Sequence, residues 1–581
     1  MRALRGGTAA LTLLLAGAGA GLAQSALERN LPPAARSDGA AGLPAPAQGP
    51  ASDDATPLGV DLKGMVFLSA TDPVEAAPVA AVDTTRVPIL ADPAFVTEMA
   101  ALLGRPVTRQ MLSQIEARAA GRFRAAGRPF VSVTTPPQEV TGGVLRFRVV
   151  EYRAGDVRVD GADAGTAARA RQSVRLERGG AVETARLQED LDWLNRSPFR
   201  SVEAEFAPGS RFGETDLSLK VNQGTPWQVF GGYANSGSQT TGLDRWYVGG
   251  MLADLPLSGS LLSYQFTTSS DFWWDDGRAF AQAGDPAYVS HGARFLLPLA
   301  ARQEMEATFS AVESSEAAEA FDVLKQTVEF SLGYRGALSN LIGTPAGDVS
   351  AGLETKRQSR DTFFGGTQVL AQAIEVRQLY LGWNGGGTDG FGRYSLDASV
   401  HVSPGDIGRD NSNADFALYS GGRVTDASYA YAEAVYSRTV DLPHAMKLNG
   451  TFIGQYAAQP LPETEQFTLG GEYAVRGYTS EDGSFDAGLI FRGEWRLPSF
   501  AALPKTAGVN DALSPFLFVD AGFGYDQFID VEVTAASVGL GADWQLGSAL
   551  RANLALACAL ADAVATRSGD WSLLARVTAS Y

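Results

Sequence analysis

Two charged residues in the last quarter of the chain lie in sequence surroundings that raise the question of which groups they pair with. Asp520 lies inside the apolar stretch 516–524, FLFVDAGFG, and Arg476 lies in the glycine-rich stretch 473–488, YAVRGYTSEDGSFDAG. A carboxylate in so apolar a strand predicts an inward face and a cationic partner. Arg476 alone is also typical of a solvated surface loop, because glycine and serine turn the chain there and three acids make the stretch polar: Glu481, Asp482 and Asp486.

Other residue types that carry chemistry are scattered. The three histidines lie in separate segments without metal-ligand spacing, and the single cysteine lies in the apolar run ANLALACALAD: His291, His401, His444 and Cys558. Zinc and catalytic sites need such side chains at defined spacings. We therefore expect no enzyme activity, no metal site and no cofactor, and we expect Cys558 to be an apolar strand residue.

The first 23 residues predict export. Arg2 and Arg5 precede an apolar run that is too short to span a bilayer, and a small-residue site ends at Ala23, as in a cleaved secretory signal peptide. No later segment reaches the roughly 18 apolar residues of a transmembrane helix. One cysteine excludes an intramolecular disulfide, and a net charge of −18 argues against a nucleic-acid partner.

The mature chain divides into a linker, two small mixed units and a long region of strands. Residues 24–57 are rich in Ala, Pro and Gly, which predicts a linker with a short helix at 25–31. Residues 58–152 and 153–224 each combine strands with a helix of 3–4 apolar spacing, at 107–127 and 183–197. Each region therefore predicts a small α+β domain.

From residue 225 to 581 the apolar period is two. The stretches 260–268, 446–456, 488–497 and 571–581 alternate apolar and polar side chains, and the chain holds 65 glycines. Strands of about ten residues with one apolar face suit a transmembrane β-barrel, in which every backbone polar group is paired. The length allows about sixteen strands. A soluble β-sandwich is the alternative, although the aromatic last residue, Tyr581, favours the barrel.

Three stretches resemble one family, the two-partner secretion transporters of the haemolysin-activator type. The C-terminal stretch matches that superfamily's Val-Arg-Gly-Tyr loop motif and its Phe-x-Asp-x-Gly strand motif; the units 58–152 and 153–224 resemble its two periplasmic POTRA repeats. The matching residues are Val475, Arg476, Gly477 and Tyr478; Phe518, Asp520 and Gly522; Pro137 and Gln138; and Asn195 and Pro198. Tyr581 stands where the family commonly ends in Phe.

The resemblance implies an outer-membrane barrel of about sixteen antiparallel strands, with two POTRA domains in the periplasm of a Gram-negative bacterium. It implies that the loop folds into the lumen and that Arg476 meets Asp520. The implied function is secretion of a large exoprotein recognised by the POTRA residues. The implied partners are that exoprotein, outer-membrane lipid and the barrel assembly machinery, with the transporter a monomer. Two alternatives stay open: a barrel assembly factor of the same superfamily, and a passive porin.

Overall fold

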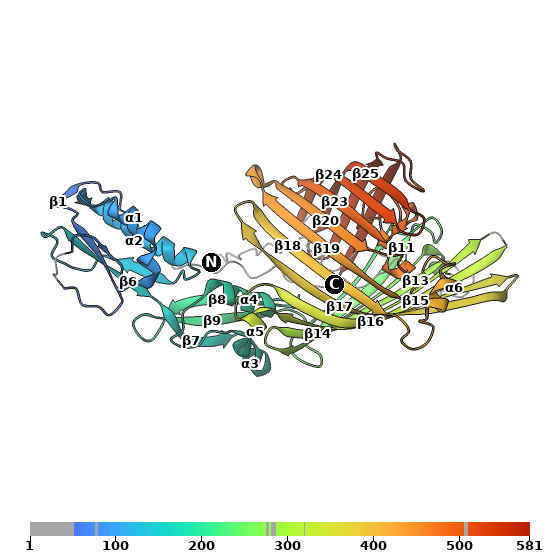
Figure 1. Cartoon of the computed structure of the whole chain (residues 1–581), viewed down its shortest axis with the longest axis horizontal. Coiled ribbons are helices and arrows are strands. Elements are labelled where there is room, and N and C mark those ends of the chain that lie inside the picture. The colour runs from blue at the N-terminus through green and yellow to red at the C-terminus, as the bar shows by residue number, and fades with distance from the viewer. Residues whose placement is uncertain (1–51, 76–78, 275–277, 281–285, 319, 505–508) are drawn as a thin grey trace. The chain divides into compact units, whose positions relative to one another are not determined.

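The computed structural model describes residues 52–75, 79–274, 278–280, 286–318, 320–504 and 509–581. The chain forms two compact units that divide between Gly224 and Thr225 (Figure 1). The predicted signal peptide and the short helix at 25–31 lie outside the described residues. Among the described residues, no helix is long and apolar enough to cross a bilayer. The predicted limits of the individual domains remain a prediction.

The first unit contains mixed α+β structure throughout. Its sheets are β3-β2-β6-β5, β7-β9-β8 and the pair β1-β4. Its elements are β1 (Pro57–Asp61), β2 (Gly64–Leu68), β3 (Val82–Asp83), α1 (Pro93–Ala100), β4 (Pro106–Thr108), α2 (Arg109–Ala125), β5 (Val131–Thr134), β6 (Val144–Glu151), β7 (Arg153–Asp160), α3 (Ala164–Ser173), α4 (Thr184–Leu194), β8 (Arg200–Pro208) and β9 (Glu214–Gln223).

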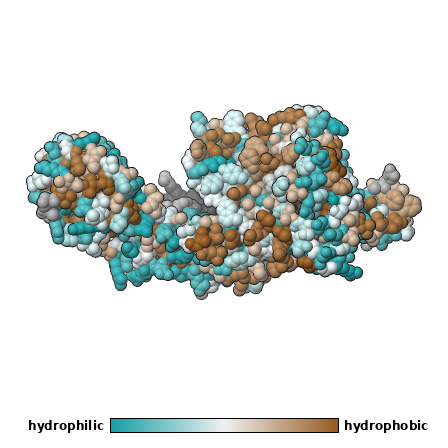
Figure 2. Space-filling model, in the orientation of Figure 1, coloured by the Kyte–Doolittle hydropathy of each residue, from teal (hydrophilic) through white to brown (hydrophobic). Residues whose placement is uncertain are grey.

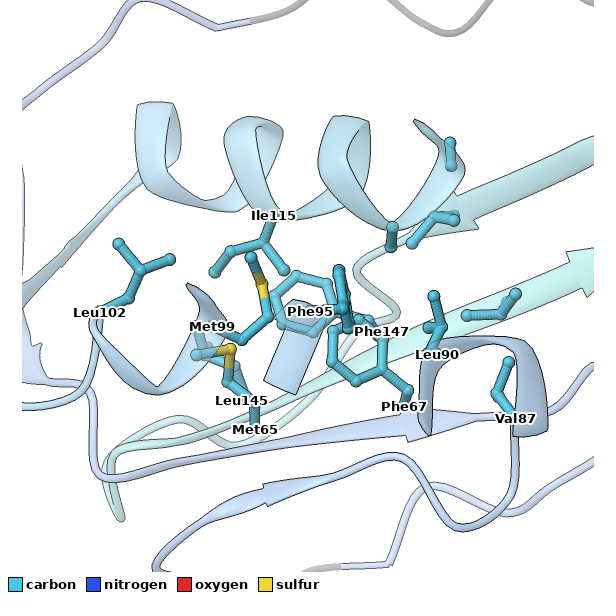
Figure 3. Packing of buried hydrophobic residues seen from close by; sticks show 14 of the residues in the cluster. Met65, Phe67, Val87, Leu90, Phe95, Met99, Leu102, Ile115, Leu145 and Phe147 are labelled. Carbon is cyan, nitrogen blue, oxygen red and sulfur yellow. The ribbon is translucent and has the colours of Figure 1, made fainter. Parts of the chain in front are cut away.

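Two apolar cores hold this unit. In the first, Phe67 of β2 stacks on Phe147 of β6 with 5.4 Å between ring centroids and meets Phe95 of α1 edge-on (Figure 3). Helix α2 covers this sheet with Ile115, and Thr108 caps it by accepting a hydrogen bond from the backbone N of Met111. The second core packs α3 and α4 against β7, β8 and β9.

In the described residues, sixteen strands close into one antiparallel barrel, which confirms the predicted fold class. The strands are β10 (Trp227–Ala234), β11 (Arg245–Ala253), β12 (Leu261–Thr268), β13 (Tyr288–Ala300), β14 (Gln303–Ala318), β15 (Phe321–Ala337), β16 (Asp348–Phe364), β17 (Thr367–Asp389), β18 (Gly392–Pro404), β19 (Ser428–Asp441), β20 (Lys447–Ala457), β23 (Ala487–Arg496), β24 (Asp511–Asp526), β25 (Val531–Leu546), β26 (Leu550–Ala559) and β27 (Trp571–Ser580). Short helices α5 (Ser339–Ile342) and α6 (Asn413–Tyr419) lie between strands.

The alternation along the strands sorts side chains between the two faces of the barrel. In β23, Leu489 is 51% exposed on the outside and Ile490 is 1% exposed on the inside; in β24, Val519 is 52% exposed and Asp520 is buried. Apolar residues accordingly form broad areas over the barrel strands on the visible face (Figure 2). The outer face of the barrel is therefore apolar, and the polar side chains point into the lumen.

The barrel closes where its first and last strands pair. Strand β10 pairs with β27 from Phe230–Ser580 to Ala234–Arg576. Tyr581 continues this ladder, because its backbone N donates to the Val229 carbonyl at 2.9 Å and its carbonyl accepts from Val229 N at 3.0 Å. Its ring lies outside, 87% exposed and 5.9 Å from the ring of Trp227. The last residue is thus part of the closing seam.

Candidate functional site

The connection between β20 and β23, residues 458–486, folds into the barrel; we call it the inward segment. It contains η4 (Glu463–Glu465), a two-residue pair of strands, β21 (Phe467–Thr468) and β22 (Ser484–Phe485), and η5 (Ser480–Asp482). Its buried Phe467, Leu469 and Val475 pack in one cluster with Ile490 of β23. Because Ile490 lies on the inner face of its strand, this cluster places the segment against the lumen side of the wall.

Arg476 connects the inward segment to the wall strand β24. Its Nε donates to Asp520 Oδ2 at 2.7 Å, and its Nη2 donates to Asp520 Oδ1 at 2.8 Å. Its backbone N also donates to Asp520 Oδ2, at 3.2 Å. The side chains of Arg476 and Asp520 are 4% and 0% exposed. A forked guanidinium on one carboxylate is the strong form of an ion pair and fixes orientation as well as distance.

A second carboxylate completes the site. Glu494 of β23 accepts from Arg476 Nη1 at 2.8 Å and from Arg496 Nε at 2.9 Å, and Arg496 continues to Asp543 at 2.6 Å. The Arg476 guanidinium also lies 3.8 Å from the centre of the Phe518 ring. Sequence reasoning missed Glu494, although its inward position followed from the alternation of the strand 488–497.

The remaining motif residues shape the contact between the segment and the wall. A Cβ at Gly522 would come within 2.7 Å of Val475 Cγ2, and Gly477 adopts a φ of +96°, so both positions favour glycine. The Tyr478 hydroxyl donates to the carbonyls of Ala536 and Ala561, at 3.0 and 2.8 Å. The structure therefore brings all seven predicted residues of the two motifs together on the inner wall.

Two of the three acids in the stretch 473–488 are not solvated, contrary to the interpretation that all three make it polar; Glu481 is partly exposed. Asp482 is fully buried and accepts from the backbone N and the Oγ1 of Thr566, both at 2.7 Å. Asp486 is also fully buried and pairs with Arg423 at 2.7 Å. These acids act as fixed acceptors, because their carboxylates replace water with backbone and guanidinium donors.

The predicted POTRA residues form structural clamps in the first unit. The amide of Gln138 donates to the carbonyl of Arg146 at 2.7 Å and accepts from its backbone N at 2.8 Å. Asn195 makes the same two bonds to Val202, at 3.0 and 2.6 Å. Pro137 is exposed and Pro198 half-buried in the same two turns. Each amide thus fixes a turn to a strand.

The histidines lie apart, as their sequence positions predict. His291 is in β13, His401 in β18, and His444 between β19 and β20. Cys558 is a half-buried residue of β26, opposite Val538 on the outer face. Within the described part of the chain, no group of three or more His, Cys, Asp or Glu side chains could hold a metal ion.

Comparisons with known proteins agree with this architecture. Residues 341–543, which include Arg476, Glu494 and Asp520, match the family model "Haemolysin secretion/activation protein ShlB/FhaC/HecB". The outer membrane transporter CdiB-2 of Burkholderia pseudomallei is 24% identical over 381 residues, 63% of this chain and 61% of the relative. The outer membrane transporter CdiB of Dickeya dadantii is 25% identical over 395 residues, 64% of each chain.

Residues 341–543 are therefore similar to the ShlB/FhaC/HecB family, and nearly two thirds of this chain is similar in sequence to outer membrane transporters of the CdiB type. The alignments span somewhat under two thirds of the CdiB relatives. The structure of CdiB from Escherichia coli superposes with a TM-score of 0.65 over 93% of both chains, at 15% identity, and so has the same fold. The closed barrel with its exposed apolar outer face and the similarity to outer membrane transporters together place the protein in the outer membrane.

Proposed function

We propose that this protein secretes a large exoprotein across the outer membrane. The observation that carries the proposal is the inward segment held inside a closed barrel by the Arg476–Asp520 pair, within the residues that match the family model. A passive porin would need no α+β unit such as residues 58–224. Movement of the wall-bound inward segment would clear lumen space for a polypeptide chain, which is what polypeptide transport requires.

We also propose that the first unit receives the exoprotein. Strand β8 is at the edge of the sheet β7-β9-β8 and pairs, among the described residues, with β9 only. An edge strand presents unpaired backbone groups to which an extended chain can add as a further strand. The exoprotein would then be held unfolded on the first unit, and its folding outside the cell would drive transport without nucleotide.

The other proposed partners follow from the surface of the barrel. Its exposed apolar outer face, with Leu489 and Val519, requires outer-membrane lipid, and the barrel assembly machinery would insert it with Tyr581 in the closing seam. We propose a monomer, because the barrel closes on its own strands and leaves no edge to pair with a second copy.

The test is co-expression with the exoprotein encoded by the neighbouring gene. The full chain should release that exoprotein into the medium. A chain lacking residues 58–224 but keeping the signal peptide should insert as a heat-modifiable barrel and release none. Normal release without the first unit would overturn its role as receptor. If depletion of the full chain instead lowered the amount of other outer-membrane barrels, the protein would be an assembly factor.

A further inference from the structure

A second buried ion pair holds the inward segment, on another part of the barrel wall. Lys356 of β16 places its Nζ 2.9 Å from both carboxylate oxygens of Glu465, at the end of η4. The side chains of Lys356 and Glu465 are 6% and 0% exposed. Glu465 also accepts from the Tyr431 hydroxyl at 2.7 Å and from Gln378 Nε2 at 2.9 Å.

The two ion pairs lie well apart around the barrel. In the strand order, β17, β18, β19, β20 and β23 separate β16, which carries Lys356, from β24, which carries Asp520. The side-chain contacts of Glu465 come from β16, β17 and β19 and its carbonyl accepts from Gln455 of β20, whereas the contacts of Arg476 come from β23 and β24. The inward segment is therefore anchored to two distinct sectors of the wall.

The chemistry of the two anchors differs in what separation would leave behind. If Arg476 moved away, Asp520 would stay buried without its forked partner, which is a costly state. If Glu465 moved away, Lys356 would keep a carboxylate neighbour, because Glu354 Oε2 lies 3.8 Å from its Nζ. Glu465 itself would leave on the mobile segment and could be hydrated.

The Lys356 anchor also holds a surplus of acid. Three buried or half-buried carboxylates gather there, those of Glu354, Glu433 and Glu465, while the bases are Lys356 and His401. His401 lies 3.5 Å from Glu354 and 3.6 Å from Glu433 and stacks on Tyr431 with ring planes 4° apart. Lys356 is thus the cation that contacts the Glu465 carboxylate directly.

We propose that Lys356 is the positioning residue at which the inward segment is released, while Arg476 keeps the segment on the opposite sector of the wall. The inference rests on the proposed transport function, because release of one side clears lumen space for a passing chain. Lys356 is suited to this role since a lysine is a point charge that exchanges partners without the geometric loss of an arginine fork.

The test uses the full-length protein with Cys558→Ser and one reporter cysteine. Leu461→Cys reports on the part of the segment near Glu465, and Ala474→Cys reports on the part near Arg476; both positions are buried. Labelling by a water-soluble thiol reagent is measured on barrels that show normal heat-modifiability, so no exoprotein is required. Failure of this test therefore leaves the secretion test of the proposed function independent.

Lys356→Met should raise the labelling rate of the Leu461→Cys reporter at least tenfold and leave that of the Ala474→Cys reporter within twofold. Lys325→Met is the matched control, because Lys325 pairs with Glu316 at 3.0 Å in the adjoining hairpin and not with the inward segment. Lys356→Arg should behave like the parent protein. The pair Lys356→Met with Glu465→Gln should label more slowly than Lys356→Met alone, since the unpaired carboxylate has gone.

Two results would overturn the proposal. Equal labelling of Lys356→Met and Lys325→Met would show that the ion pair does not retain the segment. An equal rise at both reporters would show that the segment leaves as one body rather than by release at Lys356. If Lys356→Met gives no heat-modifiable barrel, Glu465→Gln decides instead, because it removes the same ion pair: labelling of the Leu461→Cys reporter should rise while that of the Ala474→Cys reporter stays within twofold, and labelling equal to that of the parent protein would overturn the proposal.

Discussion

The interiors of the two units are built from opposite kinds of side chain. The first unit buries Phe67, Phe95 and Phe147 in contact with one another, and its charged residues lie mainly on the surface. Inside the barrel, the fully or nearly fully buried groups include Arg476 and Asp520, while residues such as Val519 lie outside. One chain therefore folds with apolar residues inward in one unit and outward in the other.

The difference follows from the surroundings of each unit. Burial of an aromatic side chain is favourable only if the alternative is water, at about 25 cal/mol per Å² of apolar area. The outer face of the barrel meets hydrocarbon, so apolar residues gain nothing by moving inward there. Attachment inside the barrel accordingly combines the apolar cluster around Phe467 and Ile490 with ion pairs and hydrogen bonds, which have direction and can be separated and remade.

The largest expected effect is in the first unit. Phe67→Ala removes a ring that touches two others, and a large-to-small change of this kind costs about 3–5 kcal/mol. Amide hydrogen exchange should accelerate in β2, β6 and α2 and stay unchanged in the barrel strands. Phe212→Ala is the matched control, because Phe212 is 77% exposed in the same unit. Equal hydrogen-exchange rates in Phe67→Ala and Phe212→Ala would show that the buried aromatic cluster does not stabilise the first unit.

A charge on the outside of the barrel should cost somewhat less. Val519→Arg places a cation on the lipid face of β24, which costs about 2–4 kcal/mol near the bilayer midplane. The temperature at which the barrel loses its compact gel mobility should fall, and Val519→Leu should leave it unchanged. An unchanged temperature for Val519→Arg would mean that this face does not meet hydrocarbon.

Removal of either amide clamp, at Asn195 or Gln138, should lower the free energy of unfolding by less, and only in the first unit. Asn195→Ala leaves the N–H and carbonyl of Val202 without these partners, which costs about 1–3 kcal/mol for buried groups. Gln138→Ala should cost less, since Gln138 is partly exposed whereas Asn195 is 4% exposed. Hydrogen exchange of β8 and β6 measures the two effects, and the reverse order would contradict the burial argument.

The smallest effect is expected for an exposed ion pair. Arg357 pairs with Asp410 at 3.0 Å, with side chains 50% and 29% exposed. Pairs of this kind contribute about 0–1 kcal/mol, so Arg357→Ala should leave both barrel stability and secretion near their parent values. A loss comparable to that of a buried pair would show that this surface contact has a function of its own.

Regular patterns made much of the fold predictable. Alternation over 488–497 fixed which residues of β23 face outward, and apolar spacing over 107–127 indicated α2. Helices α1 and α3 were not predicted. Helix α1, with the sequence PAFVTEMA, is only eight residues long, too short for a clear apolar period. Helix α3, with the sequence AGTAARARQS, carries small residues and arginines where an apolar stripe would be expected.

The candidate site was predictable only where a local motif marked it. Arg476 lies in the Val-Arg-Gly-Tyr motif and Asp520 in the Phe-x-Asp-x-Gly motif, and the resemblance to the two-partner secretion transporters implied that these two residues meet. Lys356 and Glu465 are 109 residues apart with no motif around either, and nothing local distinguishes them from solvated charges. Asp482 and Asp486 were misjudged for the same reason, because burial of an acid depends on donors supplied by distant segments such as the one around Thr566.

The central claim is that Arg476 and Asp520 act as one anchor for the inward segment during secretion. The most direct test measures exoprotein release by Arg476→Ala, Asp520→Ala and the double variant, each at equal levels of inserted barrel. Breaking a buried pair from either side costs about 3–5 kcal/mol, so each single variant should lose at least tenfold in release. The double variant should be little worse than either single, because the second change removes a contact that is already lost. Losses that multiply in the double variant would contradict the account, since the two residues would then act independently.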